Sequence, residues 1–268
     1  MTFPPERIVC LTEETVETLY LLGQERKIVG VSGYAVRPKR VRKEKPRVSA
    51  FISANVPKIL KLNPDLVLTF SDIQAEISAK LISEGLEVHC FNHRTIKGIF
   101  EMIISLGSMV GAPEESQKLV NDLKRRLALV KKIVDGRPPL KVYFEEWDDP
   151  LISGINWVSE LVEIAGGTDI FGDKSKHKSA RDRVVTSKEV IDANPDIIIA
   201  SWCGKKVQPK RIIGRKGWSN ISAIAENQVF EIKSSIILQP GPAALTDGLD
   251  AILNIFKQHK SWKGENIS

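Results

Sequence analysis

The sequence is poor in cysteine and lacks the motifs of the common catalytic classes. Its three cysteines, Cys10, Cys90 and Cys203, lie far apart in 268 residues and show no zinc-binding spacing. The chain contains no nucleophile elbow, no P-loop, no dinucleotide fingerprint and no His-Glu-x-x-His motif. We therefore predict that the protein is not an enzyme, with no catalytic residues, no metal site and no resident cofactor.

Long apolar runs are also missing. No segment approaches the roughly 18 to 20 apolar residues that a bilayer-spanning helix needs. The first eleven residues, MTFPPERIVCL, do not combine a basic segment with an apolar stretch, which is the pattern of an export signal. The chain as written is therefore expected to be cytoplasmic, or periplasmic if a signal has been removed ahead of Met1.

Positive charge is concentrated in two segments. The net charge is +6, and residues 37–47 and 205–216 are the most basic stretches of the chain. These stretches are either solvated loops or a positive rim around a site for an anionic ligand or partner. Neither contains interleaved aromatic residues, so we expect no nucleic-acid partner.

The longest predicted element is a helix over Pro113–Val134. Proline suits its first turn, and Gly136 ends it. Its apolar residues recur at steps of four, four, three and four, which is one face of a helix: Leu119, Leu123, Leu127, Val130 and Val134. About 22 residues at ~1.5 Å rise would span on the order of 30 Å, the width of a small domain.

Similar sequences stand on the two sides of this helix. Asn63-Pro64-Asp65 and Asn194-Pro195-Asp196 each follow a short helical pattern and precede a continuous apolar run. Such a run is typical of a buried parallel strand. We predict an α/β fold of two three-layer α/β lobes joined by one long helix. The expected boundaries are 1–111 for the first lobe, 112–136 for the helix and 137–268 for the second lobe.

Aromatic and acidic residues gather where predicted strands end. Tyr34, Phe51 and Phe70 follow or end strands of the first lobe, and Trp202 ends a strand of the second. Because α/β folds bind ligands at the carboxyl ends of their strands, these residues are candidate ligand contacts. The alternative for each of them is packing in the core.

The acidic segment 145–149 has several interpretations. Trp147 stands among four carboxylates in what we expect to be a loop after a strand. Glu146 and Asp148 are candidates for recognising ligand amides. Hard cations also prefer clustered carboxylates, and an enzyme would have to use Glu145, Glu146 and Asp148, but no further metal ligands are suitably spaced. Plain solvation of the loop is the third alternative.

Two other polar features are ambiguous. His93 follows a predicted strand and would be either a ligand to a bound metal complex or a surface or capping histidine. Arg181 and Arg183 would bind a phosphate or carboxylate, or form ion pairs within a loop.

These features together resemble a known family. A strand followed by Thr-Glu and a helix, then Val-Gly-Val-Ser-Gly-Tyr over 29–34, Asn-Pro-Asp-Leu-Val over 63–67 and a long helix, resemble the helical-backbone class of ABC-importer substrate-binding proteins. The resemblance covers about residues 7–258. Ile152-Ser153-Gly154, followed by the Trp157 helix, makes it most similar to the vitamin B12-binding branch.

The resemblance implies a function and a ligand site. It implies that two lobes hold a corrinoid such as cobalamin in the cleft between them, for import or intracellular handling. A ferric siderophore or haem is the alternative ligand. The residues implied to contact the ligand are Tyr34, Phe51, Phe70, Trp147, Trp202 and Gln239, because aromatic platforms suit a large apolar macrocycle.

The resemblance also bears on the macromolecular partner of the protein. Family members dock on a membrane permease through one glutamate on each lobe, and the aligned positions here hold Pro57 and Lys188. Glu189 is adjacent to the second position, whereas Pro57 has no acidic neighbour. These replacements argue against an ABC permease as partner. We expect a monomer whose partner is the small-molecule ligand.

Overall fold

The computed structural model describes residues 3–263, and its contacts divide the chain into two compact units. Unit 1 contains the residues up to His93, Lys97–Lys124 and the short segment Gln239–Pro242. Unit 2 contains Arg94–Ile96, Arg125–Leu238 and the residues from Ala243 onward. The three-part division expected from the sequence stays a prediction.

Unit 1 is built on a parallel sheet of five strands. Their order in the sheet is β3-β2-β1-β4-β5, with adjacent strands in parallel register. Because all the strands are parallel, their carboxyl ends lie at one edge of the sheet. The strands are β1 (Ile8–Cys10), β2 (Ile28–Ser32), β3 (Arg47–Ser49), β4 (Leu66–Phe70) and β5 (Val88–Phe91).

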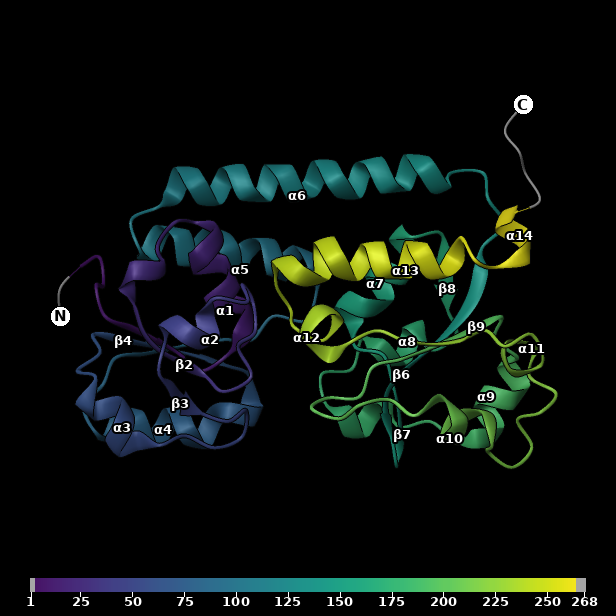
Figure 1. The fold of residues 1–268 in the computed structure, drawn as a ribbon, viewed down its shortest axis with the longest axis horizontal. Helices are drawn as coiled ribbons and strands as arrows, with labels where there is room; N and C mark the ends of the chain where they lie inside the picture. The colour runs from purple at the N-terminus through teal and green to yellow at the C-terminus, as the bar shows by residue number, and fades with distance from the viewer. Residues whose placement is uncertain (1–2, 264–268) are drawn as a thin grey trace. The chain divides into compact units, whose positions relative to one another are not determined.

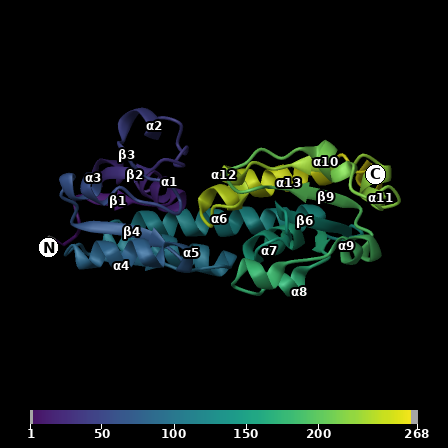
Figure 2. The same cartoon turned by 90° about the horizontal axis from the view of Figure 1, so that it is seen from below.

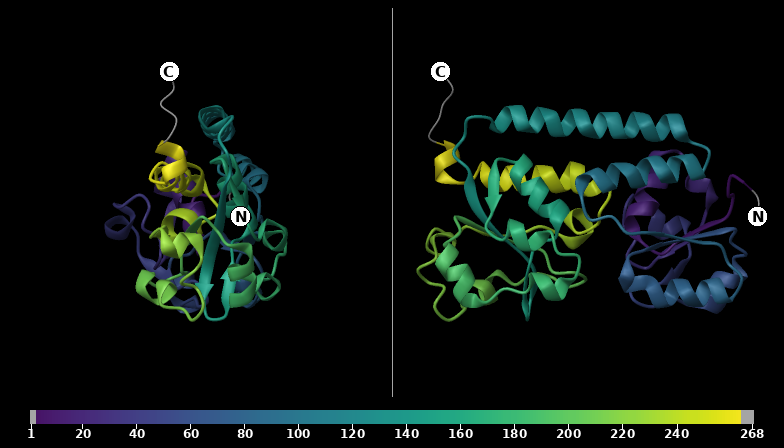
Figure 3. Two further views of the ribbon diagram at one scale, coloured as in Figure 1. Left: turned by 90° about the vertical axis from the view of Figure 1, so that its right-hand side faces the viewer. Right: turned by 180° about the vertical axis from the view of Figure 1, so that it is seen from behind.

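Helices cover both faces of this sheet, giving three layers (Figure 1). One face packs Val9 and Val67 against Ile59 and Leu81, which lie on α3 and α4. Helices α1 and α5 lie on the other face (Figure 3). The helices of unit 1 are α1 (Glu13–Leu21), α2 (Val41–Glu44), α3 (Val56–Lys61), α4 (Ala75–Ser83) and α5 (Ile96–Met109).

Helix α6 has the bounds expected from the sequence, Pro113–Val134. Leu123, Leu127, Val130 and Val134 are buried, as the apolar spacing predicts. Near its start, α6 approaches α5 so closely that a Cβ on Gly107 would lie 2.3 Å from the Cβ of Ser116. This crossing leaves no room for a side chain at position 107.

Unit 2 has a mixed sheet in the order β10-β9-β6-β7, with β8 also paired to β6. Strand β7 is antiparallel to β6, and the other pairs are parallel. Figure 2 shows β6 and β9 side by side. The strands are β6 (Leu140–Asp148), β7 (Leu151–Ser153), β8 (Gly167–Asp169), β9 (Ile197–Ala200) and β10 (Val229–Glu231).

The helices of unit 2 also pack on a hydrophobic core. Tyr143 and Ile198 of the sheet lie in one cluster with Val190 of α9 and Ile212 of α10. The helices are α7 (Asn156–Ile164), α8 (Gly172–Ser175), α9 (Ser187–Ala193), α10 (Pro209–Ile213), α11 (Ser222–Ala225), α12 (Ser234–Ile237), α13 (Leu249–Phe256) and α14 (Lys260–Lys263). Among the described helices, none combines the length and apolar character that membrane crossing requires. The predicted α/β fold is confirmed, with sheets built mainly of parallel strands.

One local expectation was wrong. Strand β6 does not end at Phe144 but continues through the acidic segment to Asp148. Trp147 pairs there with Ile152 of β7 in antiparallel register. The segment can form a strand because basic side chains from distant parts of unit 2 neutralise its carboxylates, as described below.

Candidate functional site

Large apolar side chains are exposed at the carboxyl edge of the unit 1 sheet. Tyr34 follows β2 and is 49% exposed, Ile52 follows β3 and is 75% exposed, and Ile73 follows β4 and is 53% exposed. Exposed side chains of this size that gather at one edge are typical of a binding surface. Tyr34 is among the ligand contacts predicted from the sequence, whereas the two isoleucines are not.

The other candidates of unit 1 are more buried. Phe51 is half-buried, and its carbonyl oxygen accepts a hydrogen bond from Gln74 Nε2 at 2.8 Å. Phe70 is 6% exposed and makes an edge contact with the His93 ring at 5.3 Å. Gln239 is half-buried in the segment that returns to unit 1.

His93 is held by the same returning segment. Its Nε2 lies 2.7 Å from the carbonyl oxygen of Pro240. This contact engages Nε2, and the other ring nitrogen, Nδ1, is buried within the protein, so neither nitrogen is presented to a bound ligand. This placement favours the capping interpretation of His93 over the ligand interpretation.

Two buried acids at the start of α1 escaped the sequence analysis. Glu13 and Glu14 are 6% and 1% exposed. Burial raises the pKa of Glu13 to about 7 and that of Glu14 to about 8. Thr12 Oγ1 donates to Glu14 Oε1 at 2.5 Å, and Gly241 packs directly on the Glu14 side chain.

These raised pKa values predict that unit 1 loses stability as the pH rises. A carboxyl whose pKa is raised on folding binds its proton more tightly in the folded state, so its contribution is complete below pH 4.5 and is lost as the pH passes through 7 to 8. We expect the free energy of unfolding of unit 1 to fall by roughly 3–6 kcal/mol between pH 5 and pH 9, since a pKa difference of one unit corresponds to ~1.4 kcal/mol. Hydrogen exchange of β1 and β4 amides at several pH values measures it.

The matched variants are Glu14→Gln and Glu76→Gln. The first should flatten the fall with pH, because the amide cannot ionise. The second removes an exposed acid of unit 1 and should leave the profile unchanged. Parallel profiles for the wild type and Glu14→Gln would contradict the assignment.

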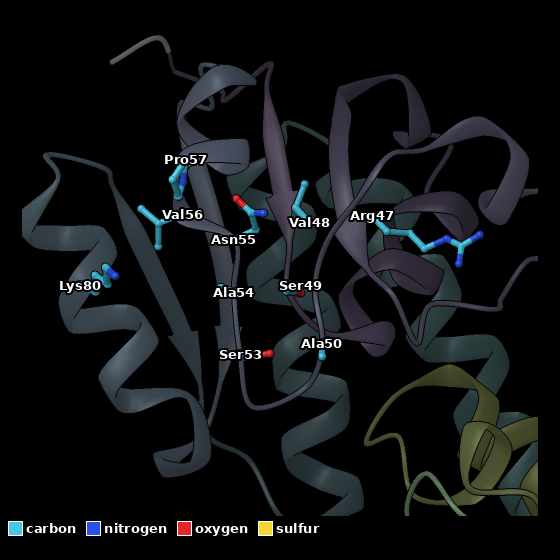
Figure 4. Close-up of a pocket in the computed structure, with 10 residues that line it drawn as sticks. All are labelled: Arg47, Val48, Ser49, Ala50, Ser53, Ala54, Asn55, Val56, Pro57 and Lys80. Atoms are coloured by element: carbon cyan, nitrogen blue, oxygen red, sulfur yellow. The ribbon is translucent and has the colours of Figure 1, made fainter.

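Unit 1 also has an open pocket of about 640 Å³ (Figure 4). It is formed by β3, the loop that follows it, the start of α3 and Lys80 of α4. Figure 4 shows the Arg47 side chain pointing away from the other lining residues. Pro57 is in the lining, whereas Tyr34, Phe51 and Phe70 are not. The pocket therefore does not include the predicted ligand contacts.

In unit 2, the first two carboxylates of the acidic segment form ion pairs. Glu145 is fully buried, and its Oε1 accepts from Arg215 Nη2 at 3.0 Å and from Trp202 Nε1 at 3.1 Å. Glu146 accepts two hydrogen bonds from Arg183, which is itself 2% exposed. Both carboxylates are thus occupied within the protein, which favours structural roles for them.

The other two candidates of this segment, Trp147 and Asp148, lie beside other basic side chains. Asp148 Oδ1 lies 2.6 Å from Lys205 Nζ, and Asp148 Oδ2 lies 3.2 Å from Arg211 Nη1. Lys205 Nζ also lies 4.5 Å from the centre of the half-buried Trp147 ring. Within residues 3–263, no three acidic, histidine or cysteine side chains are grouped to hold a metal ion.

Trp202 lies beneath this group. It is 1% exposed and belongs to the hydrophobic core of unit 2. Its placement favours core packing, and Trp147 is the more accessible of the two indoles. The structure thus brings Trp147, Asp148 and Trp202 together around Lys205, whereas Glu146 is held by Arg183.

The chain is similar to known proteins in both sequence and fold. The profile of a family described as periplasmic binding protein matches residues 8–236. The chain belongs to this family. Its members bind substrates and are not enzymes, as the sequence predicted.

Individual similar proteins include a vitamin B12-binding protein and a substrate-binding lipoprotein. The vitamin B12-binding protein of Vibrio cholerae is 26% identical over 259 residues, which cover 95% of this chain and 90% of the relative. Its crystal structure superposes with a TM-score of 0.76 and covers 98% of this chain and 100% of that chain. An ABC transporter substrate-binding lipoprotein of Bacillus subtilis is 26% identical over 258 residues, covering 92% of this chain and 79% of the relative.

A haem-binding protein shares the fold. The periplasmic heme-binding protein of Roseiflexus has a TM-score of 0.79 at 21% identity and covers 93% of this chain and 98% of that chain. The names of these proteins thus include a binder of vitamin B12 and a binder of heme.

Proposed function

We propose that this periplasmic binding protein binds a corrinoid of the cobalamin type. The observation that carries the proposal is the exposed apolar edge of unit 1, formed by Tyr34, Ile52 and Ile73. A corrin is a large macrocycle with an apolar face, and such side chains bury much of it for little loss of conformational entropy. Trp147 supplies an indole at the carboxyl end of β6 in unit 2. The 26% identical vitamin B12-binding relative supports the same ligand.

A titration with cyanocobalamin tests the proposal. All five tryptophans lie in unit 2, so quenching of their fluorescence reports ligand binding to that unit, while calorimetry gives the stoichiometry. We expect one-to-one binding, weakened on the order of tenfold in Trp147→Ala and in Ile52→Ala.

Leu129→Ala is the matched control. Leu129 is an equally apolar side chain, 59% exposed on α6, and its truncation should leave the affinity unchanged. Absence of heat and quenching at millimolar ligand would overturn the corrinoid assignment.

Haem or a ferric siderophore is the second candidate ligand. It is favoured by two cations that pair with Asp148, Lys205 and Arg211, because these ligands carry anionic oxygens. Haemin titrated under the same conditions distinguishes the candidates: tighter binding of haemin than of cyanocobalamin would select it.

We also propose that the protein acts as a monomer and does not dock on a permease through acidic side chains. Pro57 and Lys188 are exposed on α3 and α9. Glu189 does not substitute, because its carboxylate accepts from the Thr186 backbone N–H and pairs with Lys174. Sedimentation giving a dimer would contradict the first statement. Permease binding abolished by Glu189→Gln would contradict the second.

A further inference from the structure

Two cations at the carboxyl end of β6 share one carboxylate. Lys205 and Arg211 both pair with Asp148, whose side chain is only 3% exposed. The Lys205 side chain is 35% exposed and that of Arg211 is 54% exposed. The carboxylate is therefore inside the protein, while both positive groups reach solvent.

Aromatic rings fix the position of Lys205. Its Nζ lies 4.5 Å from the Trp147 ring centre and 4.8 Å from the Trp202 ring centre. A cation between two indole faces is attracted to both of them and loses part of its freedom before any ligand arrives. Lys205 is thus preorganised beside the indole that we propose to contact the ligand.

Two neighbouring carboxylates form ion pairs with other cations. Glu145 pairs with Arg215, and Glu146 pairs with Arg183. Glu231, at the end of β10, accepts from the Val207 backbone N–H at 3.1 Å. The ion pairs described for Lys205 and Arg211 are both to Asp148, so the two cations share one carboxylate.

The topology puts these two cations near the carboxyl edge of the unit 2 sheet. Strands β6, β9 and β10 are parallel, so the residues that follow them gather at one edge of the sheet. Trp147 and Asp148 end β6, and Lys205 follows β9.

We propose that Lys205 and Arg211 bind an anionic phosphodiester of the ligand and so make the protein specific for complete cobalamins. This inference rests on the proposed corrinoid function. A cobalamin carries one phosphodiester, which links the corrin to its nucleotide base, whereas a cobinamide lacks both phosphodiester and base. Hydrogen bonds from a cation to a phosphate oxygen are about twice as strong as neutral ones. A bound phosphodiester would give the two cations a second anionic partner beside the Asp148 carboxylate that they share.

The experiment compares two corrinoids with four proteins. Cyanocobalamin and dicyanocobinamide are titrated into the wild type, Lys205→Gln, Arg211→Gln and the control Lys206→Gln. Lys206 is an exposed cation of the same loop. We expect Lys205→Gln to weaken cyanocobalamin binding on the order of tenfold and Arg211→Gln by a smaller factor, with dicyanocobinamide binding unchanged in both. The Lys206 variant should bind both corrinoids like the wild type.

The other possible results contradict either the inference about Lys205 or the proposed corrinoid function. Equal weakening of both corrinoids in Lys205→Gln would show that Lys205 acts through packing, and unchanged binding of both would show that it does not contact the ligand. Either result overturns the inference and leaves the corrinoid function standing. If the wild type binds neither corrinoid, the proposed function itself fails. Dicyanocobinamide binding also confirms that a variant is folded.

Discussion

Replacing Arg215 with methionine is expected to destabilise unit 2 by about 3–5 kcal/mol, because it leaves a buried carboxylate without its cation. Glu145 is 0% exposed, so water cannot replace the lost partner. The remaining hydrogen bond from Trp202 Nε1 does not neutralise a full negative charge. Guanidinium unfolding followed by tryptophan fluorescence measures the loss, since all five indoles lie in unit 2.

Two further variants define the cause. Lys216→Met removes an exposed neighbouring cation and should change the stability by less than about 0.5 kcal/mol. The double variant Glu145→Gln/Arg215→Met should recover part of the loss, because a neutral amide oxygen still accepts the Trp202 hydrogen bond without a buried charge. A single Arg215→Met variant as stable as the wild type would contradict the assigned role of the pair.

The second large effect is expected at the crossing of α5 and α6. Glycine to alanine in the middle of a helix normally stabilises by about 1 kcal/mol. At Gly107 the sign should reverse, because the new Cβ would lie 2.3 Å from Ser116 Cβ and 2.9 Å from the Ala112 carbonyl oxygen. We expect Gly107→Ala to destabilise the protein by about 2–3 kcal/mol, as overpacking of a tight contact does. Thermal unfolding followed by circular dichroism measures the change.

The neighbouring and opposing residues provide the controls for this crossing. Ser108→Ala changes an exposed position of the same helix and should be neutral or slightly stabilising. Ser116→Gly, combined with Gly107→Ala, should restore part of the stability by removing the atom that clashes. If Gly107→Ala raised the melting temperature, the close approach of the two helices would be refuted.

The repeated Asn-Pro-Asp pattern made much of the fold predictable. Both asparagines end a short helix with a left-handed backbone, with φ of 45° at Asn63 and 44° at Asn194. Each precedes a buried strand, β4 or β9. Helix α6 was predictable because one uninterrupted apolar face ran between a proline and a glycine.

The site was less predictable because its decisive contacts are long-range. In the sequence, Glu145 and Asp148 have the pattern of polar loop residues. Their cationic partners, Arg215 for Glu145 and Lys205 for Asp148, stand about 60 to 70 positions later in the chain, so local patterns do not reveal the pairing. Trp202 ends a strand as expected, but the depth at which its side chain lies depends on packing that periodicity does not encode. Strands of three residues, such as β3 and β7, are too short to carry a recognisable alternation.

The return of Gln239–Pro242 to unit 1 has a consequence for biosynthesis. The rest of unit 1 ends at Lys124, yet Pro240 and Gly241, which pack on His93 and Glu14, are translated roughly 120 residues later. At about 5–20 residues per second, the ribosome needs on the order of ten seconds to supply them. During that interval, the nascent unit 1 lacks the segment that packs on His93 and on the buried acids of α1, so these side chains are exposed to solvent. A gene fragment stopping after α6 would encode unit 1 without the segment Gln239–Pro242, and these side chains would stay exposed.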